Sequence, residues 1–106
     1  MGEMADWREV AKADAVEEDE GVGVEVEGLN IGIFLFEGKY YACENICPHG
    51  AAFLSDGFQE GCEIECPLHQ GRFDFITGAP TAPPVDSPIR TYPVKEEGGS
   101  LFVDIG

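Results

Sequence analysis

Two short segments of the chain carry the residue types that bind metals. The segments CPH (residues 47–49) and CPLH (residues 66–69) each offer one thiolate and one imidazole, and a proline follows each cysteine. Sixteen residues separate the two segments, and the chain has no further histidine. Thiolate and neutral imidazole are good ligands for iron and for zinc. The two segments therefore predict a single metal centre, held by Cys47, His49, Cys66 and His69.

The order of these ligands favours an iron–sulfur cluster over zinc. Zinc sites with two cysteines and two histidines usually place a C-x(2–4)-C pair before an H-x(3–5)-H pair on a helix. Here cysteine and histidine alternate, and no helix is predicted around them. In a Rieske [2Fe–2S] centre, two histidines replace two cysteines on one of the irons. We favour this cluster, with a structural zinc module and an unligated set of residues as the alternatives.

Length and charge limit the possible functions. At 106 residues the chain is long enough for one domain with a modest core. Neither a long apolar run nor a secretory signal pattern is visible, so we expect a cytoplasmic protein that does not enter a membrane. The formal net charge is −15, from 21 acidic and 6 basic residues. Such a charge argues against nucleic-acid binding and favours basic protein partners.

Short strands separated by glycine turns predict an all-β, antiparallel fold. Residues 21–28 alternate, with Val22, Val24 and Val26 on one face, and apolar runs follow at 31–36 and 39–42. Turns are expected at 27–30 and at 37–38. Residues 6–10 should begin the fold with Trp7 packed inside. Residues 11–20 should form a loop, with one helical turn as the alternative.

The second half of the chain predicts further short strands. Residues 63–65 and 71–75 flank the second ligand segment, and residues 90–95 and 100–105 should form a hairpin over 96–99. Residues 79–88 contain four prolines, which excludes a central strand and predicts an extended surface segment. We therefore expect a β-sandwich-like base, residues 1–42 and 80–106, that carries a small inserted cluster-binding lobe, residues 43–79.

A wider stretch of the sequence resembles a known family. The segment ECPLHQGRFD (65–74), with SDG (55–57) before it and TYPVK (91–95) after it, resembles the Rieske ferredoxin component of bacterial aromatic ring-hydroxylating dioxygenases, of the naphthalene and biphenyl types. The resemblance implies three antiparallel sheets with the cluster at one tip. It also implies Cys47 and Cys66 on the inner iron and His49 and His69 on the outer iron. Pro83 and Pro84 should form a third loop over the cluster.

This resemblance implies a one-electron carrier rather than an enzyme. Electrons would come from an NAD(P)H-dependent flavoprotein reductase and pass to a terminal oxygenase, with the carrier itself a monomer. An oxygenase site needs further histidines for a mononuclear iron, and both histidines are already assigned. A reductase needs a G-x-G-x-x-G motif after a strand, which the chain lacks. The small Rieske subunit of a nitrite reductase-like system is the alternative carrier.

Comparison with respiratory Rieske proteins predicts a low reduction potential. Those proteins carry an extra disulfide, and the matching positions here are Ala52 and Leu68. They also carry serine and tyrosine hydroxyls that bond to the cluster sulfurs, where this chain has Gly71 and Phe73. Hydrogen bonds to sulfur stabilise the more negative, reduced state. We therefore expect a potential near the low end of the Rieske range of roughly −150 to +300 mV.

Other residues near the ligand segments have simpler expected roles. Cys43 and Cys62 should be buried thiols, with a mutual disulfide or ligation as the alternatives. Arg72 is expected to form a salt bridge rather than a docking contact. Four phenylalanines are expected in the core of the lobe: Phe53, Phe58, Phe73 and Phe75.

Overall fold

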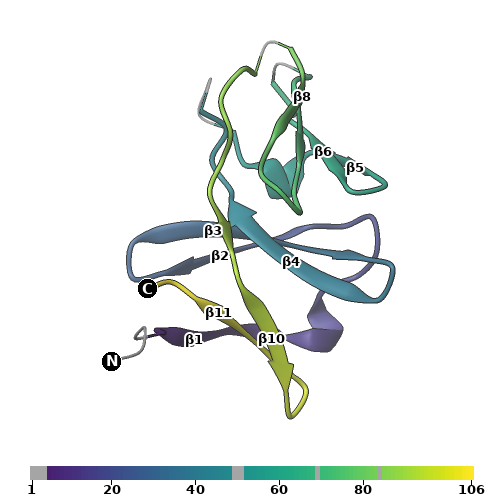
Figure 1. The fold of residues 1–106 in the computed structure, drawn as a ribbon. Helices are drawn as coiled ribbons and strands as arrows, with labels where there is room; N and C mark the ends of the chain where they lie inside the picture. Colours follow the sequence, from purple (N-terminus) through teal and green to yellow (C-terminus); the bar gives the residue numbers. More distant parts are fainter. Residues whose placement is uncertain (1–4, 49–51, 69, 84) are drawn as a thin grey trace.

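The computed structural model describes residues 5–48, 52–68, 70–83 and 85–106 (Figure 1). Its strands form three antiparallel sheets, in the orders β1-β11-β10, β2-β3-β4-β9 and β5-β6-β7-β8. The all-β, antiparallel prediction is confirmed, as are the three sheets that the resemblance implies. The described elements are β1 (Trp7–Lys12), η1 (Ala13–Ala15), β2 (Val22–Val26), β3 (Leu29–Phe36), β4 (Lys39–Glu44), η2 (Leu54–Asp56), β5 (Phe58–Glu60), β6 (Glu63–Glu65), β7 (Arg72–Asp74), β8 (Pro80–Ala82), β9 (Thr91–Tyr92), β10 (Val94–Glu97) and β11 (Ser100–Asp104).

The helical elements η1 and η2 are single 3₁₀ turns. Within the described ranges, no helix is both long and apolar enough to cross a membrane. In Figure 1 the sheets of β1 and of β2 lie one above the other as the base, and the β5–β8 sheet lies at the far end. The boundary of the lobe at residues 43–79 stays a prediction, and the third sheet continues to Ala82 through β8.

Two tight turns build the central sheet of the base. Glu27-Gly28 and Glu37-Gly38 have φ values of 52° and 80°, and of 53° and 80°. Two consecutive positive φ values define a type I′ turn, whose twist matches that of the flanking strands. The first turn is shorter than predicted, because Leu29 already pairs with Val26 in the ladder. The predicted alternation along β2 is confirmed.

Pro93 divides the predicted strand at residues 90–95 between two sheets. Before it, β9 pairs with β4 through Ala42–Tyr92 and Cys43–Thr91. After it, β10 pairs with β11 as the predicted hairpin, over Gly98-Gly99. Proline lacks the N–H that a continuous ladder needs, so the chain leaves one sheet here and joins the next.

The N-terminal strand is longer than predicted and its tryptophan is less buried. Ala11 and Lys12 complete β1, and the 3₁₀ turn η1 follows, which matches the alternative of one helical turn rather than the favoured loop. Trp7 is half-buried rather than packed inside. The ammonium group of Lys95 lies 4.6 Å from the centre of its ring, in a cation–π contact at the edge of the base.

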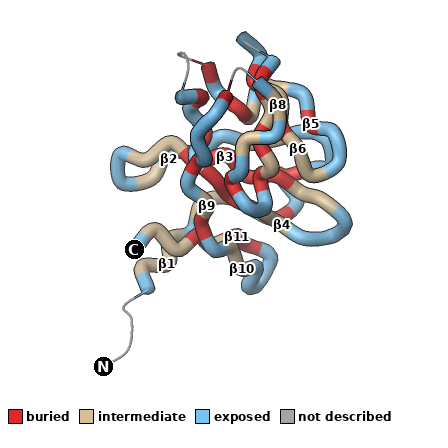
Figure 2. The backbone as a smooth tube through the Cα atoms, turned by 45° about the horizontal axis from the view of Figure 1, so that its top comes forward, coloured by how far each residue is buried: buried red, intermediate tan, exposed pale blue. Residues whose placement is uncertain are grey.

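Figure 2 marks the buried residues in red along the backbone. Their side chains form two clusters. One fills the space between the two base sheets, with Ile31, Ile33, Leu101 and Val103 fully buried. The other joins the central sheet to the lobe. Its centre is the ring of Phe75, whose centroid lies 4.9 Å from that of Phe34, 6.3 Å from that of Phe36 and 5.8 Å from that of Tyr41.

The four phenylalanines expected in the core of the lobe divide into two pairs. Phe73 and Phe75 are fully buried, as predicted, but Phe53 and Phe58 are 45% and 60% exposed. In β5 the buried position is taken by Gln59, so strand alternation turns its neighbour Phe58 outward. The prediction was wrong for these two residues.

The proline-rich segment is extended, as predicted, and part of it pairs. β8 lies at the edge of the third sheet and begins at Pro80, a position where a strand tolerates proline. Pro83 is exposed, and Pro84 lies outside the described residues. The expected third loop over the cluster therefore stays a prediction.

Candidate metal centre

Cys47 and Cys66 begin two hairpins of equal size. The backbone N–H of Cys47 donates to the carbonyl of Ala52 at 2.9 Å, and that of Cys66 donates to the carbonyl of Gly71 at 2.7 Å. Each bond spans five residues. The pairs just outside also correspond, with Ile46 opposite Phe53 and Glu65 opposite Arg72. The C-x-H and C-x-x-H motifs differ in length, but the hydrogen bond that closes each hairpin spans the same number of residues.

Both cysteine side chains point into protein rather than solvent. Cys47 is 1% exposed and Cys66 is fully buried, and both belong to the cluster of side chains between lobe and base. His49 and His69 lie outside the described residues, so the structure places two of the four predicted ligands. Two buried cysteines on matched hairpins suit a centre with thiolate ligands on its protein side, and the donor set fits a Rieske cluster. In the described part of the chain, no group of three or more histidine, cysteine, aspartate or glutamate side chains is arranged to hold a metal ion.

The segment entering the first hairpin is tied to the segment that follows the proline-rich stretch. The backbone N–H of Glu44 donates to the carbonyl of Arg90 at 2.8 Å. The carboxylate of Glu44 in turn accepts the backbone N–H of Arg90 at 2.6 Å. This reciprocal pair joins residues 46 positions apart in sequence. Nothing in the local sequence indicated this contact.

Arg72, next to the second hairpin, is surrounded by carboxylates. Its guanidinium nitrogens lie 2.6 Å from Glu60, 3.5 Å from Glu63 and 3.0 Å from Glu65. Hydrogen bonding to Glu60 is the main cause that raises the pKa of Arg72. The predicted salt-bridge role is confirmed, and the arginine links β5, β6 and β7 across the outer face of the lobe.

Cys43 and Cys62 are separate thiols outside the two hairpins. Cys43 is fully buried, and burial, with a smaller effect of Glu44, raises the pKa of its thiol to about 12. Cys62 is half-buried, with its sulfur 3.7 Å from a carboxylate oxygen of Asp74. Burial and then Asp74 raise the pKa of that thiol as well. Both are free, so the alternative of a disulfide between them is wrong.

The fold and the paired hairpins can now be compared with known proteins. The model of the Rieske [2Fe-2S] domain matches residues 6–93. The chain belongs to the Rieske family. The ferredoxin component of the naphthalene 1,2-dioxygenase system of Pseudomonas aeruginosa is 48% identical over 99 residues, which cover 93% of this chain and 95% of the relative.

Solved structures agree with this assignment. The Sphingomonas yanoikuyae B1 ferredoxin superimposes with a TM-score of 0.90 at 37% identity, covering 95% of this chain and all of the other. A second match comes from a complex of reduced oxygenase and oxidized ferredoxin in carbazole 1,9a-dioxygenase. Its TM-score is 0.86 at 31% identity, and it covers 92% of both chains.

Family membership decides between the alternatives that the sequence left open. The cofactor is one Rieske-type [2Fe–2S] cluster rather than zinc. The matched relatives are ferredoxin components, so the chain is an electron-transfer protein of this family and not a catalytic subunit. The relatives named above belong to dioxygenase systems, which favours the dioxygenase carrier over the nitrite reductase-like alternative.

Proposed function

We propose that the protein carries single electrons from an NAD(P)H-dependent flavoprotein reductase to the terminal oxygenase of an aromatic ring-hydroxylating system. The observation that carries this proposal is the near full-length similarity to a naphthalene dioxygenase ferredoxin. The complex of oxygenase and ferredoxin in carbazole dioxygenase supports the oxygenase as one partner. The reductase is inferred from the need for an electron source. We place the carrier in the cytoplasm, where NAD(P)H is available, as a monomer.

We assign the cluster to Cys47, His49, Cys66 and His69. The two hairpins of equal span support the assignment, because each can supply one thiolate and one imidazole from the same kind of loop. Burial of both cysteines supports placing them on the inner iron, with the histidines on the outer iron. When bound, the cluster supplies a reversible one-electron change of iron valence. The buried cysteine side keeps water away from the sulfur ligands, which leaves the histidine side for exchange with partners.

The surface near the hairpins supports docking to a basic partner with an apolar centre. Ile46, Phe53 and Leu68, all within or beside the hairpins, are 50%, 45% and 61% exposed. Several of the basic side chains are engaged with acids or rings of the same molecule, including Arg8, Lys12, Arg72, Arg90 and Lys95. Few basic groups are therefore left to attract acidic partners, and the net charge of −15 should speed association with a basic partner at low salt.

Reconstitution with partner proteins tests this function. A naphthalene-type oxygenase and a flavoprotein reductase should oxidise their aromatic substrate only when the purified, brown protein is added. Cys66→Ala should be colourless and inactive, whereas Cys62→Ala, four residues earlier, should stay brown and active. Turnover without the protein, or equal turnover with Cys66→Ala, would contradict the proposal.

A further inference from the structure

Asn45 lies at the point where β4 leaves the base and the first cysteine hairpin begins. Its backbone N–H donates to the carbonyl of Asn30 in β3 at 3.0 Å. Its carbonyl accepts the N–H of Leu54 at 2.6 Å, across the hairpin. The backbone of this residue therefore bonds both to the base sheet and to the returning arm of the hairpin.

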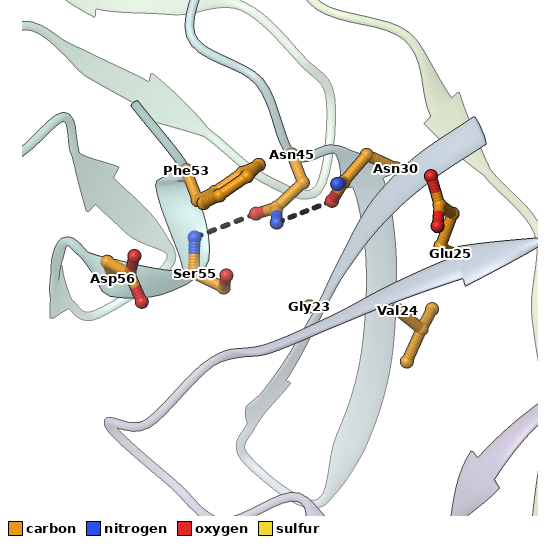
Figure 3. A pocket seen from close by; sticks show the side chains of 8 residues that line it. All are labelled: Gly23, Val24, Glu25, Asn30, Asn45, Phe53, Ser55 and Asp56. Atoms are coloured by element: carbon orange, nitrogen blue, oxygen red, sulfur yellow. Dashed lines mark hydrogen bonds between the residues drawn. The ribbon is translucent and has the colours of Figure 1, made fainter. Parts of the chain in front are cut away.

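The side chain of Asn45 repeats the same two connections (Figure 3). Its amide oxygen accepts the backbone N–H of Ser55 in η2 at 2.7 Å, and its amide nitrogen donates to the side-chain oxygen of Asn30 at 2.9 Å. The residue is only 2% exposed. A buried amide with both ends bonded fixes the separation and the angle of the segments it joins.

Two glycines leave room for this amide. Gly23 and Gly32 are directly paired across β2 and β3. A Cβ added at Gly23 would lie 2.8 Å from the amide nitrogen of Asn45 and 2.9 Å from Oγ of Ser55. A Cβ at Gly32 would lie 2.8 Å from the amide oxygen of Asn45. Both glycines lie within strands and neither has a positive φ. Glycine weakens a strand interior, so the space it leaves is the physical reason for it here.

The first hairpin depends on such an anchor more than the second does. The second hairpin continues two paired strands, β6 and β7, of a four-stranded sheet. In its described residues, the first is paired through the isolated bridge between Ile46 and Phe53 and the bonds beside it. Because this short pairing belongs to none of the three sheets, contacts with the base set its position relative to the second hairpin.

We propose that Asn45 is a positioning residue for the cluster, because its side chain holds the Cys47 hairpin in register with the Cys66 hairpin. Glycine at positions 23 and 32 leaves the space that the Asn45 amide occupies. This inference rests on the proposed ligand set. Asn45 acts through the hairpin backbone and is not itself a ligand. Its loss lets the first hairpin shift against the second, which alters the geometry of the centre without removing a ligand.

A matched pair of substitutions tests the proposal. Gln59 is also a buried amide that joins lobe to base, because its nitrogen donates to the carbonyl of Leu35 at 3.0 Å, but it lies in β5, outside either hairpin. Asn45→Ala should release the cluster from the holoprotein on the order of tenfold faster, and should shift the g values of the reduced protein's EPR spectrum. Gln59→Ala should leave the g values unchanged. Equal behaviour of the two variants would overturn the proposal.

Gly23→Ala provides a second test that keeps the asparagine. The new Cβ should displace the amide and reproduce the EPR shift of Asn45→Ala. In the double variant the two effects should not add, since both break the same contact. Fully additive effects would contradict the proposal.

Hydrogen exchange of the Leu54 and Ser55 amides separates this proposal from the proposed function. Asn45→Ala and Gly23→Ala should both accelerate exchange at the Ser55 amide, because its acceptor is the Asn45 side chain. The Leu54 amide, whose acceptor is the backbone carbonyl of residue 45, should also exchange faster as the hairpin shifts, with or without the cluster. A wild-type protein that binds no cluster would refute the proposed function. Unchanged exchange at these amides would refute the positioning role, whatever the colour of the protein.

Discussion

The ring of Phe75 is the main apolar connection between the lobe and the central sheet. It follows β7 in the lobe and lies against Phe34 and Phe36 of β3 and Tyr41 of β4. Replacing it by alanine leaves a buried cavity between the cysteine hairpins and the base. We therefore predict that Phe75→Ala both destabilises the protein and loosens the lobe from the base.

The size of this effect follows from burial. A fully buried phenylalanine replaced by alanine costs about 3–5 kcal/mol of unfolding free energy, and the side chain is fully buried here. Three aromatic contacts worth about 0.5–1.5 kcal/mol each account for a large part of this loss. Because small domains are stable by only about 5–15 kcal/mol, the variant should remain folded at low temperature but lose at least about 10 °C in Tm.

Urea unfolding of the holoprotein followed by two probes is the assay. Trp7, the one tryptophan of the chain, reports on β1 in the base, and visible absorption reports on the cluster. In the wild type both signals should change together. In Phe75→Ala the colour should be lost at lower urea than the tryptophan signal changes, because the lobe opens first.

Phe58→Ala is the matched control. This phenylalanine also lies in the lobe but is 60% exposed, so its removal should change the unfolding free energy by only about 0.5 kcal/mol. If Phe58→Ala destabilised the protein as much as Phe75→Ala, the packing argument would be refuted. Coincident loss of both signals in Phe75→Ala would refute the claim that the ring fastens the lobe.

Three further predictions concern charge, protonation and potential. Arg72→Gln leaves the negative charge of three glutamates uncompensated beside the second hairpin. The reduction potential in a redox titration should therefore fall by on the order of 10–50 mV at low salt and by less at high salt. Arg72→Lys, which keeps the positive charge, should retain most of the wild-type potential. The pKa of the Cys43 thiol is about 12 in the folded protein against 9.0 ordinarily, so the folded state keeps a proton that the unfolded chain releases. Stability from this group is complete below pH 9 and falls by about 1.4 kcal/mol per pH unit between 9 and 12, and Cys43→Ala should lack that slope in urea unfolding at pH 8 to 10.5. Redox titration should place the potential near the low end of the Rieske range, roughly −150 mV, because Gly71 and Phe73 offer no hydroxyl to the sulfurs; a high, respiratory-type value would contradict that reasoning.

Much of the fold was predictable because its signals are local. The turns Glu27-Gly28 and Glu37-Gly38 are decided by two residues with positive φ, and the alternation along β2 by its own valines. The resemblance to Rieske ferredoxins rested on the ligand segments and the residues beside them, and the match to the family model established it. Errors arose where the neighbours were distant in sequence. The residues around Phe58 do not show that Gln59 takes the inward position. Pro93 indicates a break in the strand but does not show which sheet the chain joins next.

The amino-acid sequence alone predicted the chemistry, because the residue types and spacing of two short segments favour a mixed sulfur–nitrogen centre. The match to the Rieske domain then decided the cofactor. The sequence also determined the negative charge available for partners. Tertiary structure alone decided how the ligand segments are held: equal hairpin spans from unequal motifs, the Glu44–Arg90 pair, and the amide of Asn45 over two glycines. Hydrogen bonds between segments remote in sequence depend on which surfaces packing brings together, and that information is spread over the whole chain.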